Sequence, residues 1–138
     1  MAFSVVLRIK VAYKYLNCKP KFDRNLFSIQ IHHGGAFVRF PDREYVGGAE
    51  DIIDRVDIDV FSVFDLDQMV LQLGYTGKNE PLFYHYLSPM STLNHSLFPL
   101  SCDDDVRCLS YLVDGFKLIE VYIEHGCSRV SGKTRAII

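Results

Sequence analysis

The strongest candidates for a chemical role in this 138-residue chain are three consecutive aspartates, Asp103, Asp104 and Asp105. Clustered carboxylates bind magnesium in phosphoryl-transfer enzymes, so one hypothesis is a small metal-dependent enzyme that uses this aspartate cluster. The cluster also stands where a helix is predicted to begin, and there aspartates complete the cap and complement the helix dipole. We therefore expect the three aspartates to cap the helix and to form no metal or catalytic site. Their exposed charge would serve either as an acidic interaction surface or as a solvated face that keeps the protein in solution.

The histidines and cysteines do not have the spacing of a metal site or of a nucleophilic enzyme. Adjacent His32 and His33 would point to opposite faces of a strand, and the four cysteines include no C-x-x-C pair. The chain has no G-x-S-x-G motif, and the Gly47-Gly48 pair lacks the lysine of a phosphate-binding loop. We therefore predict no catalytic residues, no metal and no cofactor.

Two glycine pairs provide the turn chemistry that would position these residues. Apolar and polar side chains alternate over residues 27–32, which is typical of a strand, and Gly34-Gly35 follows directly. We expect a Gly-Gly turn with positive φ that joins this strand to a second one over residues 36–40. Gly47 and Gly48 are the second pair of structural turn residues, and alternation over residues 56–60 predicts a further short strand or extended link.

Two helices are predicted from capping signals followed by apolar residues at helical spacing. Ser62 and Asp65 have the spacing of a capping box, and apolar residues follow at positions 66, 69, 70 and 73. Ser101 begins a second such box, before apolar residues at 106, 109, 112 and 113. We therefore expect Ser62 and Ser101 to be the two N-cap residues.

The remaining strands complete the predicted order of elements. Residues 81–87, 97–100 and 119–123 have strand composition or alternation. The order is then strand, strand, helix, strand, strand, helix, strand (ββαββαβ). It matches the ubiquitin-like β-grasp, an α+β roll in which a mixed sheet of four to five strands packs on two helices.

Charge divides the chain into three parts despite a net charge of only −2. Residues 1–24 carry six basic side chains against one acidic, and residues 127–138 carry three against none. Residues 25–126 carry sixteen acidic and six basic side chains. We expect a basic N-terminal arm (1–24), an acidic domain (25–126) and a basic C-terminal tail (127–138). An acidic domain attracts a partner with a basic surface, and it leaves nucleic-acid contacts to the termini.

The first residues predict neither a membrane span nor a secretory leader, because Arg8, Lys10 and Lys14 interrupt the apolar stretch. Unpaired cysteines are typical of a reducing compartment. We therefore expect an intracellular protein with free thiols.

The glycine-paired run of residues 32–48, the acidic stretch and short helix after it, and the closing LIEVYIEHG of residues 118–126 resemble a known domain. It is the PB-one-like (Phox/Bem-type) domain at the N-terminus of plant Mutator-like (MuDR-type) transposases. The resemblance covers about Leu26 to Gly126. It implies a β-grasp interaction module, a nuclear location, and partners that include other transposase-type chains.

The resemblance also implies how such a domain would bind. Phox/Bem-type domains pair front to back, with an acidic motif of one partner against a strand lysine of the other. Here Asp103, Asp104 and Asp105 lie where the acidic motif would be, but the first strand presents Gln30 and no lysine. We therefore expect binding through the acidic side only.

Other functions remain open from the sequence. A nucleic-acid accessory factor could act through the basic termini, and the aspartate enzyme is a further alternative. A working adaptor and a detached, degenerate transposon fragment fit the residues equally.

Overall fold

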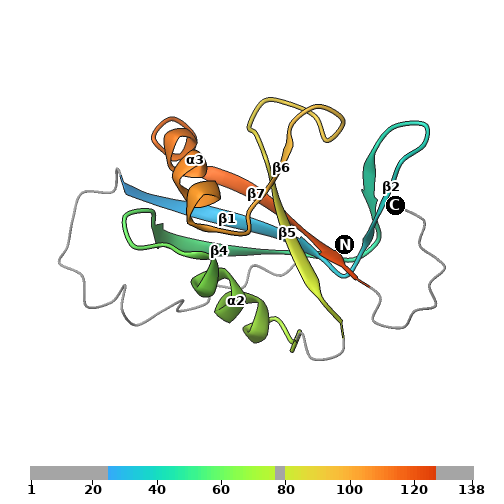
Figure 1. The fold of residues 1–138 in the computed structure, drawn as a ribbon, viewed down its shortest axis with the longest axis horizontal. Helices are drawn as coiled ribbons and strands as arrows, with labels where there is room; N and C mark the ends of the chain where they lie inside the picture. The colour runs from blue at the N-terminus through green and yellow to red at the C-terminus, as the bar shows by residue number, and fades with distance from the viewer. Residues whose placement is uncertain (1–24, 77–79, 127–138) are drawn as a thin grey trace.

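A computed structural model describes residues 25–76 and 80–126 (Figure 1). Five strands form one mixed sheet in the order β4-β1-β7-β5-β6, and β2 and β3 form a separate two-stranded sheet. The strands are β1 (Leu26–His33), β2 (Ala36–Val38), β3 (Glu44–Val46), β4 (Ala49–Asp57), β5 (Leu82–Leu87), β6 (Leu97–Pro99) and β7 (Leu118–His125). The helices are α2 (Val63–Gln72) and α3 (Asp103–Val113). The expected basic arm and basic tail lie outside the described residues.

The α+β roll is confirmed, with two helices and a mixed sheet of five strands. The central strands β1 and β7 are parallel, and the other pairs in this sheet are antiparallel. Alternate residues of β1 and β7 are buried against both helices in one apolar core, because successive strand residues point to opposite faces. The core includes Ile29, Ile31, Ile53, Leu66, Met69, Leu109, Ile119 and Ile123.

The face of the sheet opposite the helices is called the open face below. It carries polar and aromatic side chains that alternate with the core residues. They include Ser28, Gln30 and His32 of β1, Glu50 and Asp54 of β4, Glu120, Tyr122 and Glu124 of β7, and Phe83 and His85 of β5.

The first hairpin differs from the expectation. β1 does not pair with residues 36–40 but with β4, so that His33 lies opposite Ala49. Strand β4 also begins earlier than the strand expected over residues 56–60. The reason is that β1 and β4 can pair over seven positions and bury Ile53 and Val56, whereas β2 and β3 pair over only three.

The glycine pairs close the base of the inserted β2–β3 hairpin. Gly34, Gly47 and Gly48 have φ of 81°, 80° and 81°, the left-handed region in which glycine has no steric penalty. Gly35 does not have a positive φ. It is nevertheless confined by its neighbours, because a Cβ atom there would lie 2.6 Å from the carbonyl oxygens of Val46 and Gly47. The expected positive φ is therefore present at the first residue of the pair and not at the second.

Helix α2 begins at the expected N-cap, and α3 begins one residue later than expected. The Ser62 hydroxyl accepts a hydrogen bond from the Asp65 amide, and the Asp65 carboxylate accepts one from the Ser62 amide. The N-cap of α3 is Cys102, so the prediction of Ser101 was wrong. Asp105 decides this register, because its carboxylate accepts from the Cys102 amide three residues earlier.

We expect Ser62→Ala to lower the free energy of unfolding by about 0.5–2 kcal/mol, because the Asp65 amide loses its acceptor. Ser101→Ala should cost clearly less, because it removes only an exposed hydroxyl donor to Asp105. Urea unfolding of both variants measures the difference. A loss from Ser101→Ala as large as that from Ser62→Ala would contradict the assigned start of α3.

Candidate interaction surface

The three aspartates of α3 lie together at its N-terminus, but they have different surroundings. Asp105 Oδ2 accepts from the Ser101 amide at 2.7 Å, the Ser101 hydroxyl at 2.9 Å and the Cys102 amide at 3.2 Å. These hydrogen bonds, that of the Ser101 amide foremost, hold the pKa of Asp105 below its usual range. Asp105 is therefore an ionised capping group and part of the helix architecture.

Asp103 and Asp104 remain at the surface. Both side chains are exposed in the first turn of α3. Arg107 donates to Asp104 at 2.7 Å in an exposed pair one helical turn apart, and such pairs contribute little stability. Asp103 has no hydrogen-bond or ion-pair partner among the described residues. These two carboxylates are the part of the predicted acidic surface that a partner could contact.

The open face of β1 carries polar side chains that are bonded to carboxylates of the flanking strands. The Ser28 hydroxyl donates to Asp54 at 2.8 Å, and the Gln30 amide donates to Glu50 at 2.7 Å. His32 Nε2 lies 2.9 Å from Glu120 Oε1. The strand that would supply a lysine in front-to-back pairing therefore presents neither lysine nor arginine, and its polar side chains contact carboxylates.

His32, Glu120 and Tyr122 form a cluster on the open face that sequence reasoning missed. The His32 ring stacks on the Tyr122 ring with centroids 4.2 Å apart, and the Tyr122 hydroxyl donates to Glu120 at 3.0 Å. The hydrogen bond from His32, followed by that from Tyr122, lowers the pKa of Glu120 against the opposing effect of burial. Alternation in the closing strand indicated these side chains, but not their partner on β1.

The β2–β3 hairpin packs on this cluster. Figure 1 shows β2 at the right-hand end of the sheet, away from both helices. The Phe37 ring lies 5.9 Å from the Tyr122 ring, and the Tyr45 ring lies 5.3 Å from it. The Tyr45 hydroxyl donates to the Ile123 carbonyl at 2.7 Å and accepts from the Gly35 amide, and burial raises the pKa of Tyr45 to about 12. The hairpin thus covers one end of the open face.

Other histidines also pair with carboxylates. His33 contacts Asp51 and the Tyr75 hydroxyl, each at 2.7 Å. His125 Nδ1 lies 2.8 Å from Glu80, and its Nε2 accepts from the Gly34 amide. Residues 25–76 and 80–126 contain no group of three or more His, Cys, Asp or Glu side chains placed to hold a metal ion. These histidines join distant segments of the chain in pairs.

Comparison with known families identifies the domain. The family model of the PB1-like domain matches residues 23–125. The chain belongs to the PB1-like domain family. No curated protein and no solved structure gave a match. Family membership confirms the PB-one-like part of the resemblance and indicates a protein–protein interaction module with protein partners.

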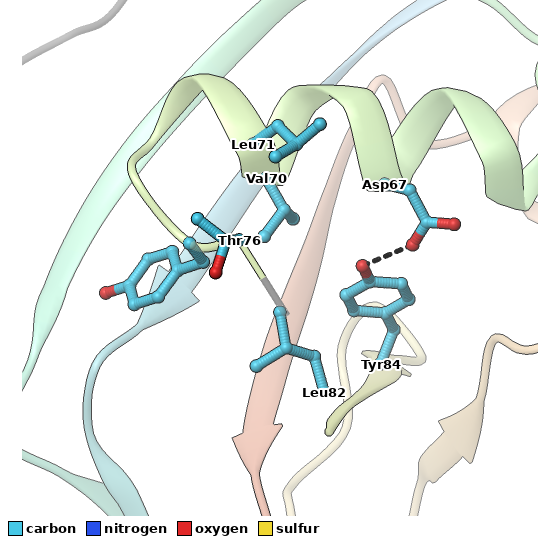
Figure 2. Close-up of a pocket in the computed structure, with 7 residues that line it drawn as sticks. Asp67, Val70, Leu71, Thr76, Leu82 and Tyr84 are labelled. Carbon is cyan, nitrogen blue, oxygen red and sulfur yellow. Dashed lines mark hydrogen bonds between the residues drawn. The ribbon is translucent and has the colours of Figure 1, made fainter. Parts of the chain in front are cut away.

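A pocket of about 320 Å³ lies between the end of α2 and the start of β5 in this PB1-like domain (Figure 2). Its lining includes Val70, Leu71 and Leu82, together with Asp67, which accepts from the Tyr84 hydroxyl at 2.5 Å. Burial, followed by this hydrogen bond, raises the pKa of Tyr84. Two ionisable side chains of the lining, Asp67 and Tyr84, are thus bonded to each other.

Within the described part of this PB1-like chain, no helix has the length and apolarity needed to span a membrane.

Proposed function

We propose that this PB1-like domain is a non-catalytic interaction module that binds a basic surface of a partner protein through Asp103 and Asp104. The observation that carries the proposal is that the three aspartates at the start of α3 have different environments. Asp105 is used by the cap, whereas Asp103 and Asp104 are exposed on a rigid helix terminus. A helix N-terminus presents such carboxylates in a fixed position, which favours the directional contacts that a basic side chain can make.

The surroundings of Gln30 support a one-sided module. Front-to-back self-association needs a basic group on one copy for every acidic surface on the other. The β1 segment contains neither lysine nor arginine, and Gln30 itself is bonded to Glu50. A second copy of this domain would therefore bring carboxylates toward carboxylates, which is unfavourable. The expected partner is a different chain with a basic strand or loop.

Residues 32–48, with their two glycine pairs, and the closing residues 118–126 support a more specific proposal about the origin of the domain. We infer that the domain derives from the N-terminal part of a plant Mutator-like (MuDR-type) transposase and acts in the nucleus, where another transposase-type chain is the candidate partner. Transposase-like coding sequence downstream at the locus would support this origin. A locus without it would favour a detached fragment.

We expect Asp103→Asn/Asp104→Asn to weaken binding of a basic partner at least about tenfold, because two charge-assisted contacts are lost. The fold should be kept, because Asp105, which completes the cap, is untouched and two exposed carboxylates near a helix N-terminus each contribute only about 0.3–1 kcal/mol. Partners captured from nuclear extract with the wild-type domain would be purified and titrated against both proteins. Binding should also weaken as salt rises.

The matched control is Glu44→Gln/Asp114→Asn, which removes two exposed negative charges from β3 and from the other end of α3. This variant should bind like the wild type, and circular dichroism should show that both variants are folded. Equal affinity of the Asp103/Asp104 variant and the wild type would refute this binding surface. An equal loss in the control would show that only the net charge matters.

A further inference from the structure

Strand β4 forms one edge of the five-stranded sheet. It spans nine residues, and within residues 25–76 and 80–126 its paired neighbour is β1 alone (Figure 1). The opposite edge strand, β6, has three residues and ends in Pro99, which has no backbone N–H to donate. An edge strand presents a row of backbone N–H and C=O groups that can pair with a strand of another protein. Of the two edges, β4 therefore offers the longer template.

The first half of β4 is the regular part of this edge. Residues 49–53 pair with β1 in continuous register, which ends with Ile53 opposite Ile29. The register then shifts, and Arg55, just after the shift begins, has φ of 60°. An irregularity of this kind bends a strand and turns its backbone groups away from a flat ladder. A strand added to this edge would therefore pair with residues 49–53.

The carboxylates along β4 decide which strand can be added. Glu50 and Asp54 lie on the open face, and the Glu50 side chain is 50% exposed. Asp51 lies on the other face, where its carboxylate is 2.7 Å from His33 Nε2. Antiparallel pairing of residues 49–53 with the same segment of a second copy would place Asp51 opposite Asp51, and like charges directly opposite each other are destabilising. A strand with lysine or arginine side chains on the open face would instead meet opposite charges.

We propose that residues 49–53 bind a basic strand of a partner protein, which extends the sheet and places its lysine or arginine side chains beside Glu50 and Asp54. Main-chain hydrogen bonds would supply most of the affinity, and the carboxylates would select a basic strand over an acidic one. This surface uses none of the residues at the start of α3. The inference therefore does not rest on the function proposed for Asp103 and Asp104.

The test is an NMR titration of the full chain with a capped peptide, as long as β4, in which valine alternates with lysine. The amide shifts of residues 49–53 should change, and the affinity is measured from these amides. Two further peptides carry N-methyl groups either on the valines only or on the lysines only. Because only alternate amides of an added strand face its neighbour, one of these two peptides should bind at least about tenfold more weakly and the other like the parent peptide. Equal affinities of the two N-methylated peptides, or unchanged shifts at residues 49–53, would overturn the proposal.

Charge variants separate strand addition at this edge from general attraction to an acidic domain. Glu50→Gln should weaken binding of the lysine peptide at residues 49–53 about two- to fivefold, because one cross-strand charge pair is lost. Glu44→Gln, at an exposed position of β3, is the matched control and should leave this affinity unchanged. Equal effects of the two variants would overturn the proposal, and so would binding of a valine–glutamate peptide at the same amides. Amides at the start of α3 report separately on the surface proposed above, so the failure of either site is distinguished from the failure of the other.

Discussion

Replacing Gly48 with alanine should lower the free energy of unfolding by about 2–4 kcal/mol, one of the largest effects of any single change in this domain. Gly48 has φ of 81°, and a Cβ atom there would lie 2.2 Å from the His33 carbonyl oxygen and 2.6 Å from the Gly35 amide nitrogen. Both neighbours are backbone atoms of the β1–β4 junction, so they cannot move aside as a flexible side chain could. The strain would separate His33 from Ala49, where β1 begins to pair with β4.

Urea unfolding followed by circular dichroism measures this loss. The control is Gly115→Ala, because a Cβ atom at Gly115 meets nothing within 4 Å and its φ lies outside the left-handed region. Gly115→Ala should leave the unfolding midpoint unchanged or raise it slightly. An unfolding midpoint for Gly48→Ala within error of the wild type would contradict the close approach of Gly48 to the His33 carbonyl oxygen.

Replacing Phe37 with alanine should cost about 3–5 kcal/mol and release the β2–β3 hairpin from the open face. Phe37 is 7% exposed, and its ring lies 5.1 Å from the Tyr45 ring and 5.9 Å from the His85 ring. Without it, the hairpin loses the apolar side chain that it buries against the sheet. Three paired positions are too few to keep a two-stranded ribbon in place alone.

Phe40→Ala is the control on the same hairpin connection, because Phe40 is 84% exposed and should contribute almost nothing. NMR shift changes in Phe37→Ala should concentrate at residues 36–46 and at Tyr122, with α2 and α3 little affected. If both phenylalanine variants unfold at the same urea concentration, the hairpin is not held by the aromatic cluster.

The α2 segment shows how much of the fold could be predicted from local sequence. Ser62 and Asp65 are three residues apart, and the apolar residues at 66, 69 and 70 lie on one face of the helix. Every interaction that defines this helix start acts within one turn, so spacing along the chain is sufficient to predict it. The alternation of apolar and polar residues in β1 and β7 is also a local pattern, so it too could be predicted from spacing along the chain.

The acidic surface could be predicted only in part. Three aspartates at the start of a helix indicate an acidic terminus, but the register of the cap depends on which carboxylate reaches the Cys102 amide. Because Asp105 and not Asp104 completes the cap, the N-cap lies one residue later than expected, and Asp103 and Asp104 remain exposed. A cap at Ser101 and a cap at Cys102 are both compatible with the same sequence pattern, so the pattern alone does not decide between them.

The sequence by itself determined the two described helices, the glycine turns and the segregation of charge, because these follow from periodicity, glycine and side-chain type. The expected order ββαββαβ was incomplete, because four strands and not two precede α2. Only the tertiary structure decided that β1 pairs with β4 and that His32 of β1 meets Glu120 of β7, 88 residues later in the chain. Such contacts depend on which apolar faces can be buried together, and this balance is reached only when the whole sheet forms around its core.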